Sequence, residues 1–492
     1  MMSPKLPGFR TPDSIRRGAE QGIQSEAEQA KNNSISLTGR KATSYLAAAV
    51  TRSLALFIPL LLLSAVPAGC SQNPPPAPDQ KADEKVDKEF YTPKDRVAAM
   101  QAATIFAPKA VADANILQGP EQDPKQFQLH LGDKVYCDFD KPGSQMGGKT
   151  PKFACKFTRV ESVGGQVQVL TPQMDEGEPV KIKYGSTDNE IYAEVVSTRL
   201  MWALGFYADS WFPVHVECNN CPADLESGSG VKSTRSFDAA TTVRKYSGHK
   251  MYEEGKPDEG WSWKEFEQYN GRPDSEKDGL RLLAAFIQHS DNKAPQQRLI
   301  CKGVKVDQST QPFTTTCKES KMLIQDVGAT FGGGGAFTSN DSAKMNLQEW
   351  SGKKLWNKTG KPGMSDTDCP VCEAVLSKSW SATDGLSDPI ITEEGRRFLA
   401  GLMCQLSDAQ IQDLFTAAQV AWMPKYHNSD GSFKQGLDEA TIKKQWVDAF
   451  KAKREELASG RCRWKNKPAD FAAIDNPMGL PTVPNHCVAP PR

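Results

Sequence analysis

Short runs of alternating hydrophobic and polar residues fill the chain between Lys134 and Gly185. The runs are KVYCDFD, KFACKFTRV, QVQVL and PVKIKYG, and the segments GSQMGGK, VGG and DEGE separate them. A period of two residues turns alternate side chains to opposite faces of a strand, and glycine-rich or acidic segments favour turns. The pattern predicts an antiparallel sheet.

The spacing of hydrophobic residues becomes helical in EIYAEVVSTRLMWALGF, where Ile191, Val195 and Trp202 share one face. Gly205 follows this segment and is a typical helix stop. The run WFPVHVEC then predicts another strand, and the glycine-rich sequence at 219–260 predicts loops.

Four later segments also have helical periodicity. They are SEKDGLRLLAAFIQH, EEGRRFLAGLMCQL, SDAQIQDLFTAAQVAWM and EATIKKQWVDAFKAKREELA, and Thr392 and Ser407 are good N-caps for the second and third. The order of elements predicts an α+β fold with two lobes. A small β-rich lobe with one helix is expected at 96–215 and a larger helical lobe at 216–475, followed by a C-terminal tail at 476–492.

Near the start of the sequence, the apolar run LALFIPLLLL at 54–63 has the features of an export signal. Arg52 precedes it and the small residues of SAVPAGC follow it, which is the order of a basic flank, an apolar segment and a cleavage region. A transmembrane helix is an alternative, but it needs about 20 apolar residues. A buried helix is disfavoured because Pro59 interrupts the run.

The end of this signal, Ala68-Gly69-Cys70, resembles the lipoprotein box of bacteria, with Pro67 where leucine is usual. The resemblance implies that Cys70 is lipidated and becomes the mature N-terminus. It also implies an exported protein anchored to a membrane and facing the periplasm, and Ser71 favours the outer membrane.

Three N-terminal segments follow from this interpretation. Residues 1–53 are a long n-region or the product of a misassigned start, with initiation at Val50 as the alternative. Residues 54–70 form the apolar region and the lipoprotein box. Residues 71–95 begin SQNPPPAPDQKADEK and predict a disordered tether, because proline and charge dominate and apolar residues are few.

The overall charge of the 492 residues is balanced. Lysine plus arginine and aspartate plus glutamate each number 60, so nothing in the charge indicates a nucleic-acid partner or binding to an anionic membrane surface. The length allows one large domain or two ordinary ones.

The cysteines favour an oxidising compartment, because most of them occur in near pairs that suit disulfides. Zinc held by C-NN-C and C-PV-C is the alternative, since both have the internal spacing of zinc knuckles. Cys404 is left without an obvious partner. The predicted pairs are Cys137 with Cys155, Cys218 with Cys221, Cys301 with Cys317, Cys369 with Cys372, and Cys462 with Cys487.

Two motifs in the first lobe resemble those of protein kinases. Val180-Lys181-Ile182-Lys183 is similar to the V-A-I-K strand, in which the lysine pairs with the phosphates of ATP. Glu194 lies eleven residues later in the predicted helix. Its register resembles the N-E…L-A-x-x-L-G helix of HipA-type serine kinases, which implies an ion pair with Lys183. Glu190 is a competing partner.

Two further motifs follow in kinase order. HSDNKAPQQRLI, entered from a hydrophobic helix, resembles the catalytic loop of HipA-type and phosphoinositide kinases. The resemblance implies that Asp291 accepts a hydroxyl proton and that Gln296, in place of the usual asparagine, binds a metal. MLIQDVGATFG resembles the D-F-G element and implies that Asp326 binds the metal. A hairpin of 299–304 with 314–317 is expected between the two motifs.

A phosphate-covering loop is expected before Lys183. GSQMGGKTPKF loosely resembles the G-x-Q-x-K loop of HipA-type kinases, with Gly147, Gly148 and Lys149 as the phosphate-binding residues, although a hairpin turn explains the same residues. Together the motifs imply a kinase-like phosphotransferase that uses ATP with Mg²⁺ or Mn²⁺. A catalytically inactive binding or scaffolding lipoprotein with the same fold, and a surface lipoprotein unrelated to kinases, are the alternatives.

Overall fold

The structure is a computed structural model that describes residues 91–459 with several gaps. The gaps are 123–125, 142–149, 170–178, 186–188, 254, 257–258, 308, 311–313, 335–342, 358–371 and 379–383. The chain divides into two units, Met1–Pro74 and Pro75–Arg492, and every described residue belongs to the second. Because the described residues begin at residue 91 and end at residue 459, the predicted signal, Cys70, most of the tether and the C-terminal tail lie outside them.

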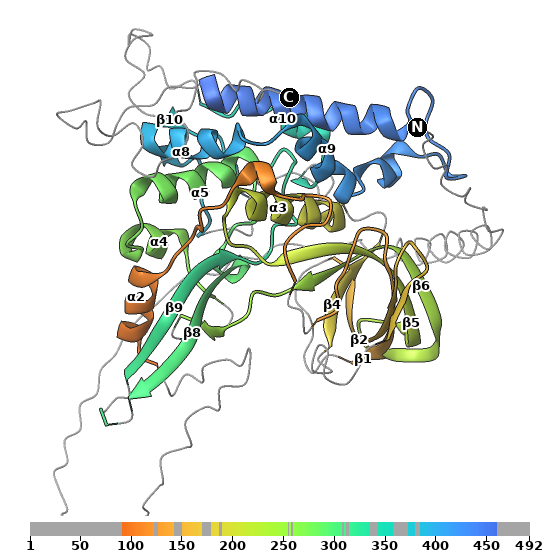
Figure 1. Ribbon diagram of the computed structural model, residues 1–492, viewed down its shortest axis with the longest axis horizontal. Helices are drawn as coiled ribbons and strands as arrows, with labels where there is room; N and C mark the ends of the chain where they lie inside the picture. The colour runs from red at the N-terminus through yellow and green to blue at the C-terminus, as the bar shows by residue number, and fades with distance from the viewer. Residues whose placement is uncertain are drawn as a thin grey trace, which may run out of the picture. The chain divides into compact units, whose positions relative to one another are not determined.

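A six-stranded sheet forms the β-rich region, in the order β1-β5-β6-β4-β2-β3, and a further pairing of β1 with β2 closes five of its strands into a ring (Figure 1). The strands are β1 (Lys134–Asp140), β2 (Lys152–Glu161), β3 (Val167–Val169), β4 (Val180–Tyr184), β5 (Ser210–Asp224) and β6 (Ser229–Arg244). Phenylalanine, valine and isoleucine side chains pack inside the ring, among them Phe153, Ile182 and Phe212.

The expectation of a wholly antiparallel sheet is wrong in one pairing, because β1 and β5 are parallel. Parallel neighbours need a long crossover, and the chain supplies one through β2, β3, β4 and helix α3 (Glu190–Leu204) before β5 returns beside β1. The sheet is therefore mixed.

The predicted loops after residue 219 are also wrong for their first part. Strands β5 and β6 form one long antiparallel hairpin that pairs Ser210 with Arg244 and Asp224 with Ser229. The first half of β6 is exposed and carries polar residues, so its sequence lacks the hydrophobic alternation that marks a half-buried strand. Strand β6 thus continues the sheet as far as Arg244.

The helical region follows the sheet in the chain, and the mixed α+β architecture predicted from the sequence is confirmed (Figure 1). Its α-helices are α4 (Trp263–Tyr269), α5 (Asp274–Phe286), α7 (Leu347–Gly352), α8 (Glu393–Met403), α9 (Asp408–Ala417) and α10 (Glu439–Ser459), and helix α2 (Pro93–Ala102) joins it from the N-terminal side. Short 3₁₀ helices are η2 (Val111–Asp113), η4 (Ala294–Gln296), η5 (Val420–Trp422) and η6 (Pro424–Tyr426).

The four predicted helices of this region are confirmed, and the predicted N-caps act as such. The Thr392 hydroxyl accepts a hydrogen bond from Gly395 N, and Ser407 forms a reciprocal capping box with Gln410. The third helix ends at Ala417, earlier than predicted, because Gln419 takes a left-handed conformation with φ of 54°.

Two small sheets complete the region. Strands β8 (Gln297–Asp307) and β9 (Thr314–Ile324) form the predicted hairpin, longer than expected, and β7 (His249–Met251) pairs with β8. Strands β10 (Cys372–Glu373) and β11 (Ile390–Ile391) form the other. No helix of the described residues is both long and apolar enough to cross a bilayer.

Three of the predicted disulfides are present. Cys137–Cys155 joins β1 to β2, Cys218–Cys221 lies within β5, and Cys301–Cys317 joins β8 to β9, with Cα atoms 5.7, 5.7 and 5.3 Å apart. The alternative prediction of a zinc knuckle at Cys218 and Cys221 is therefore wrong. Cys372 and Cys404 are also disulfide-bonded, so the expectation that Cys404 has no partner is wrong as well. Cys369, Cys462 and Cys487 lie outside the described residues.

A cluster of aromatic side chains forms the centre of the helical core. Trp446 of α10 stacks on Trp350 of α7 with ring centroids 6.0 Å apart, and Phe331 packs 4.9 Å from Trp350. Phe331 lies five residues after Asp326, so this cluster fixes the segment that begins at the candidate site.

Candidate functional site

Strand β4 places Lys183 on the outer face of the ring of strands. Ile182 points into the hydrophobic core of the ring, and the alternation of a strand turns Lys183 to the opposite side. There the Lys183 side chain is 1% exposed and its ammonium lies 4.7 Å from the centre of the Trp211 ring. A buried lysine needs negatively charged partners.

Three carboxylates surround the Lys183 ammonium. It forms a close ion pair with the fully buried Glu194, a 2.5 Å contact with Glu190, and a 3.7 Å contact with Asp326. Glu190 and Glu194 lie one turn apart on α3 and therefore share a helix face. The structure thus unites the predicted pair of Lys183 with Glu194, and Glu190 contributes beside Glu194 instead of replacing it.

Two more contacts hold Glu190 in place. The Thr150 hydroxyl donates to it at 2.5 Å and the Lys344 ammonium lies 2.6 Å away. Asn189, which precedes α3, donates to the Lys344 carbonyl at 3.2 Å. Sequence reasoning missed Lys344, because nothing in the local sequence connects it to a helix more than 150 residues earlier.

Asp326 reaches the same cluster from the end of strand β9. The backbone N–H of Val327 donates to Glu194 at 3.3 Å, and that of Gly328 donates to the Asp326 carboxylate at 3.3 Å. A Cβ atom at Gly328 would overlap the Glu190 side chain. Glycine at this position therefore permits the close approach of the Asp326 segment to α3.

The electrostatics of the cluster follow from burial and from its mixed charges. Burial alone would lower the pKa of Lys183, but Asp326, Glu194 and Glu190 outweigh it and raise that pKa well above its usual value. Burial would raise the pKa of Glu190, yet the Lys183 ammonium lowers it to about 2. Burial raises the pKa of Glu194 to about 8, with Asp326 and Glu190 opposing the attraction of Lys183. Lys183 therefore stays charged and balances its acidic neighbours.

The loop that carries Asp291 packs directly against the Asp326 segment. A ring nitrogen of the buried His289 lies 3.0 Å from the Asp326 carbonyl oxygen, and Gln325 N donates to the Gln296 carbonyl at 2.9 Å. The two predicted motifs, more than 30 residues apart in sequence, are thus held together by one side-chain and one backbone contact.

Both carboxylate oxygens of Asp291 have partners within its own loop. The Lys293 ammonium lies 3.1 Å from Oδ1, and the Gln296 amide nitrogen donates to Oδ2 at 3.2 Å. The Asp291 side chain remains 27% exposed, so a molecule with a hydroxyl group can reach it from solvent. The side-chain nitrogen of Gln296 is thus directed to Asp291, its predicted neighbour in the catalytic loop.

Asn292 fixes the loop from beneath and was missed by sequence reasoning. It is fully buried, its amide donates to the His289 carbonyl at 2.6 Å, and its side-chain oxygen accepts a 2.5 Å hydrogen bond from Leu386 N. Its own carbonyl accepts from the Trp263 indole at 2.9 Å. Two distant segments, those of Trp263 and Leu386, therefore help to set the conformation of the residues beside Asp291.

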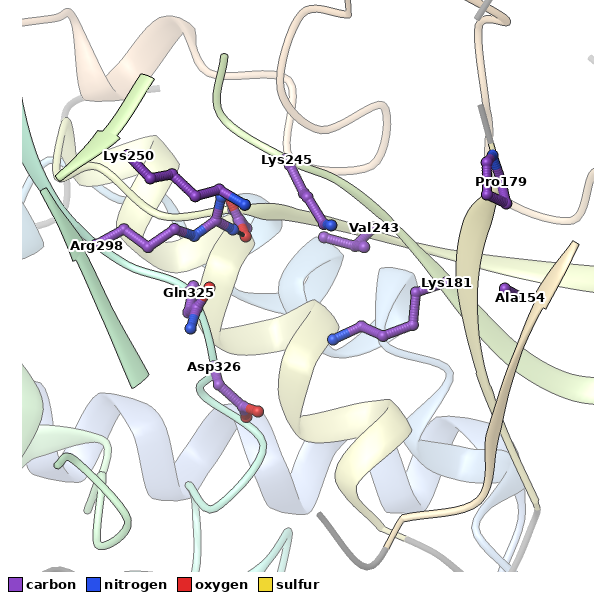
Figure 2. Close-up of a pocket in the computed structure, with 10 residues that line it drawn as sticks. Ala154, Pro179, Lys181, Val243, Lys245, Lys250, Arg298, Gln325 and Asp326 are labelled. Atoms are coloured by element: carbon purple, nitrogen blue, oxygen red, sulfur yellow. Dashed lines mark ion pairs between the residues drawn. The ribbon is translucent and has the colours of Figure 1, made fainter. Parts of the chain in front are cut away.

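A cavity of about 290 Å³ opens beside Asp326, as Figure 2 shows. Its lining comes from the six-stranded sheet and its flanking residues, from the segment after β6, from β7 and β8, and from the two residues that follow β9. The lining residues are Ala154, Pro179, Lys181, Asp209, Val243, Lys245, Lys250, Arg298, Gln325 and Asp326. The predicted phosphate-covering residues Gly147, Gly148 and Lys149 lie outside the described residues.

The carboxylates around Lys183 suit a hard divalent cation. One oxygen from each of Glu190, Glu194 and Asp326 lies within 4.8 Å of the others, and Mg²⁺ and Mn²⁺ prefer oxygen donors of this kind. Asp326 is the most accessible, with a third of its side chain exposed, whereas Glu194 is enclosed. The donor set fits such a cation, with Asp326 as the ligand that a metal and its phosphate partner can reach.

No protein-family model matches this chain, and no curated protein matches it either. Among solved structures, the crystal structure of the Helicobacter pylori proinflammatory kinase CtkA resembles it, with 10% sequence identity and a TM-score of 0.31. The alignment covers 65% of this chain and 94% of that one. A likeness this loose has no weight by itself, so the contacts around Lys183 and Asp326 must support any functional conclusion.

Proposed function

We propose that this protein is an exported, membrane-anchored phosphotransferase with a kinase-like bilobal fold. The observation that supports it is the meeting of Lys183, Glu194 and Asp326, which come from a strand, a helix and a turn spread over 143 residues (326 minus 183). The features of an export signal at 54–70 support the anchor. Transfer of a phosphate to a hydroxyl requires a cation beside the phosphates, a carboxylate that holds this cation and a carboxylate for a metal ion, and Lys183, Glu194 and Asp326 supply these three groups.

In the proposed reaction Lys183 orients the phosphate groups of the donor, and Glu194 holds Lys183 in position. Asp291 accepts the proton of the acceptor hydroxyl as its oxygen bonds to the terminal phosphorus. The bond from that phosphorus to the bridging oxygen breaks, and the bridging oxygen keeps the electron pair and leaves with the diphosphate end of the donor. A Mg²⁺ or Mn²⁺ ion held by Asp326 would supply positive charge that offsets the phosphate oxygens.

The test uses purified full-length protein with labelled ATP and Mg²⁺ or Mn²⁺. We expect labelling of the protein itself or of an added hydroxyl acceptor. Asp291→Asn should abolish labelling with little change in the melting temperature, because a partly exposed ion pair such as that with Lys293 contributes about 1 kcal/mol or less. Labelling that survives both Asp291→Asn and Lys183→Met would contradict the proposed roles.

The arrangement around Asp291 favours one second candidate. Because Lys293 and Gln296 occupy both of its carboxylate oxygens, the chain also suits a binding or scaffolding module that keeps the fold without the reaction. This candidate predicts no labelling under any condition and unchanged partner binding in Asp291→Asn.

A further inference from the structure

The cavity beside Asp326 has an unusual lining for a pocket that holds a purine base. Among the described residues that line it, Ala154, Pro179 and Val243 are the apolar ones, and none is aromatic. Small-molecule pockets are mostly hydrophobic, and nucleic-acid bases bind by stacking on aromatic rings or arginine planes. These walls offer a base little apolar surface.

Charge dominates the lining instead. Four basic residues and the two acidic residues Asp209 and Asp326 give a net charge of +2 (four minus two). Arg298 forms a buried ion pair with Asp209, so these two charges offset each other. Lys181, Lys245 and Lys250 line the same cavity as Asp326, and Figure 2 shows these four residues around it.

The three lysines come from different parts of the fold. Lys181 lies two residues before Lys183 and so shares its face of β4. Lys245 follows the end of β6, and Lys250 lies in β7. Burial, together with the charge of Lys183, lowers the pKa of Lys181 to about 8. An anion in the cavity would relieve this repulsion between cations.

We propose that this cavity binds the phosphoryl donor by its chain of phosphate groups, through Lys181, Lys245 and Lys250, with no requirement for a purine base. The inference rests on the proposed function for the identification of the ligand as a phosphoryl donor. Nucleoside triphosphates and inorganic polyphosphate both carry such a chain, and the arms of the experiment separate them.

The first experiment is calorimetric titration of purified full-length protein, in mild detergent with Mg²⁺, with ATP, inorganic triphosphate and adenosine. Triphosphate should bind within about threefold of ATP and adenosine should not bind, a difference between the first two of less than 1 kcal/mol. Binding should weaken as salt increases, because the contacts are ionic. Adenosine binding, or ATP binding more than about thirtyfold tighter than triphosphate, would overturn the proposal.

The second experiment compares lysine variants. Lys245→Met combined with Lys250→Met should weaken triphosphate binding at least about tenfold, the loss of two charged contacts. Lys434→Met, at an exposed lysine outside the cavity lining, is the matched control and should bind as the unaltered protein does. Melting temperatures verify that each variant is folded. Equal binding by all three proteins would refute the proposal.

The two experiments separate failure of this inference from failure of the proposed function. Triphosphate binding without any phosphate transfer would overturn the phosphotransferase and leave the phosphate-chain site standing. Transfer from ATP that depends on the adenosine group would support the phosphotransferase and overturn the phosphate-chain site. Absence of binding by both ATP and triphosphate would overturn the inference.

Discussion

Replacing Lys183 by methionine tests whether the charged cluster is built around this one ammonium. The substitution keeps most of the volume of the side chain and removes the cation that faces Glu190, Glu194 and Asp326. Lys344 remains beside Glu190, so the carboxylates that lose their neighbouring cation are mainly Glu194 and Asp326. We expect the folded variant to take up about one additional proton to restore the balance of charge.

The magnitude follows from that proton. A carboxyl group with an ordinary pKa near 4.5 is ionised in the unfolded chain at pH 7. Keeping it protonated in the folded state costs about 1.4 kcal/mol for each pH unit above 4.5. The variant should therefore lose about 3 kcal/mol at pH 7 and about 1 kcal/mol at pH 5. The first figure matches the 3 to 5 kcal/mol typical for removing one partner of a buried ion pair.

The sign of the pH dependence is specific. In the variant a folded-state pKa lies above its unfolded value, so the folded state binds more protons. Its stability is then greatest below about pH 4.5 and decreases as the pH rises toward 7. In the unaltered protein Lys183 lowers the pKa of Glu190 to about 2, whereas burial already raises the pKa of Glu194, so the variant differs by the steeper decrease in stability that its one additional proton causes.

The assay is urea unfolding followed by tryptophan fluorescence at pH 5, 6 and 7, with a chelator present to exclude divalent cations. Lys434→Met is the control for replacing a lysine and should change the free energy of unfolding by less than about 0.5 kcal/mol. Adding Asp326→Asn to Lys183→Met removes one carboxylate and should recover part of the loss. A loss that does not change with pH, or a double variant no more stable than the single one, would refute the reasoning.

Three further substitutions test other parts of the structure. Lys453→Met should raise the free energy of unfolding by about 2 kcal/mol at pH 7. Burial lowers the pKa of Lys453 to about 8, so keeping its charge in the folded state costs about 3 kcal/mol. Its hydrogen bond to the Lys353 carbonyl stabilises the folded state by only about 1 kcal/mol. The pH-dependent gain in stability between pH 8 and 10 should also disappear in urea titrations. Replacing Cys301 and Cys317 by serine should lower the free energy of unfolding by about 3 kcal/mol under oxidising conditions, because the disulfide closes a loop 16 residues long. Gly328→Ala should displace Glu190 and cost about 1 to 3 kcal/mol in the same assay; an unchanged midpoint would contradict the close packing there.

Local signals in the sequence predicted much of the helical region. Thr392 and Ser407 are capping residues that act within three positions of themselves, so their effect is written in adjacent sequence. The end of helix α9 at Ala417 was missed because Gln419 is not a residue type that favours a left-handed backbone.

Long-range pairings were predicted less well, for a physical reason. The parallel pairing of β1 with β5 and the contact of Lys344 with Glu190 depend on how distant segments fold back, and neither leaves a periodic trace. Lys183, Glu194 and Asp326 were placed together only because their order along the chain resembles that of kinases. The same resemblance assigned a role to Lys183, which lies outside the cavity lining, and gave no reason to expect Lys181, Lys245 or Lys250 there.

The structure separates what holds the site together from what would perform the chemistry. Lys183 and Glu194 are buried and bind each other, so their loss should reduce stability and binding alike in an enzyme and in a scaffold. Asp291 is partly exposed, and its contacts with Lys293 and Gln296 lie within its own loop, so these contacts contribute little to folding. If phosphate transfer strictly requires Asp291, a structural role of this residue does not explain the requirement. Phosphate transfer that disappears in Asp291→Asn at an unchanged melting temperature would therefore distinguish catalysis from a fold retained for binding.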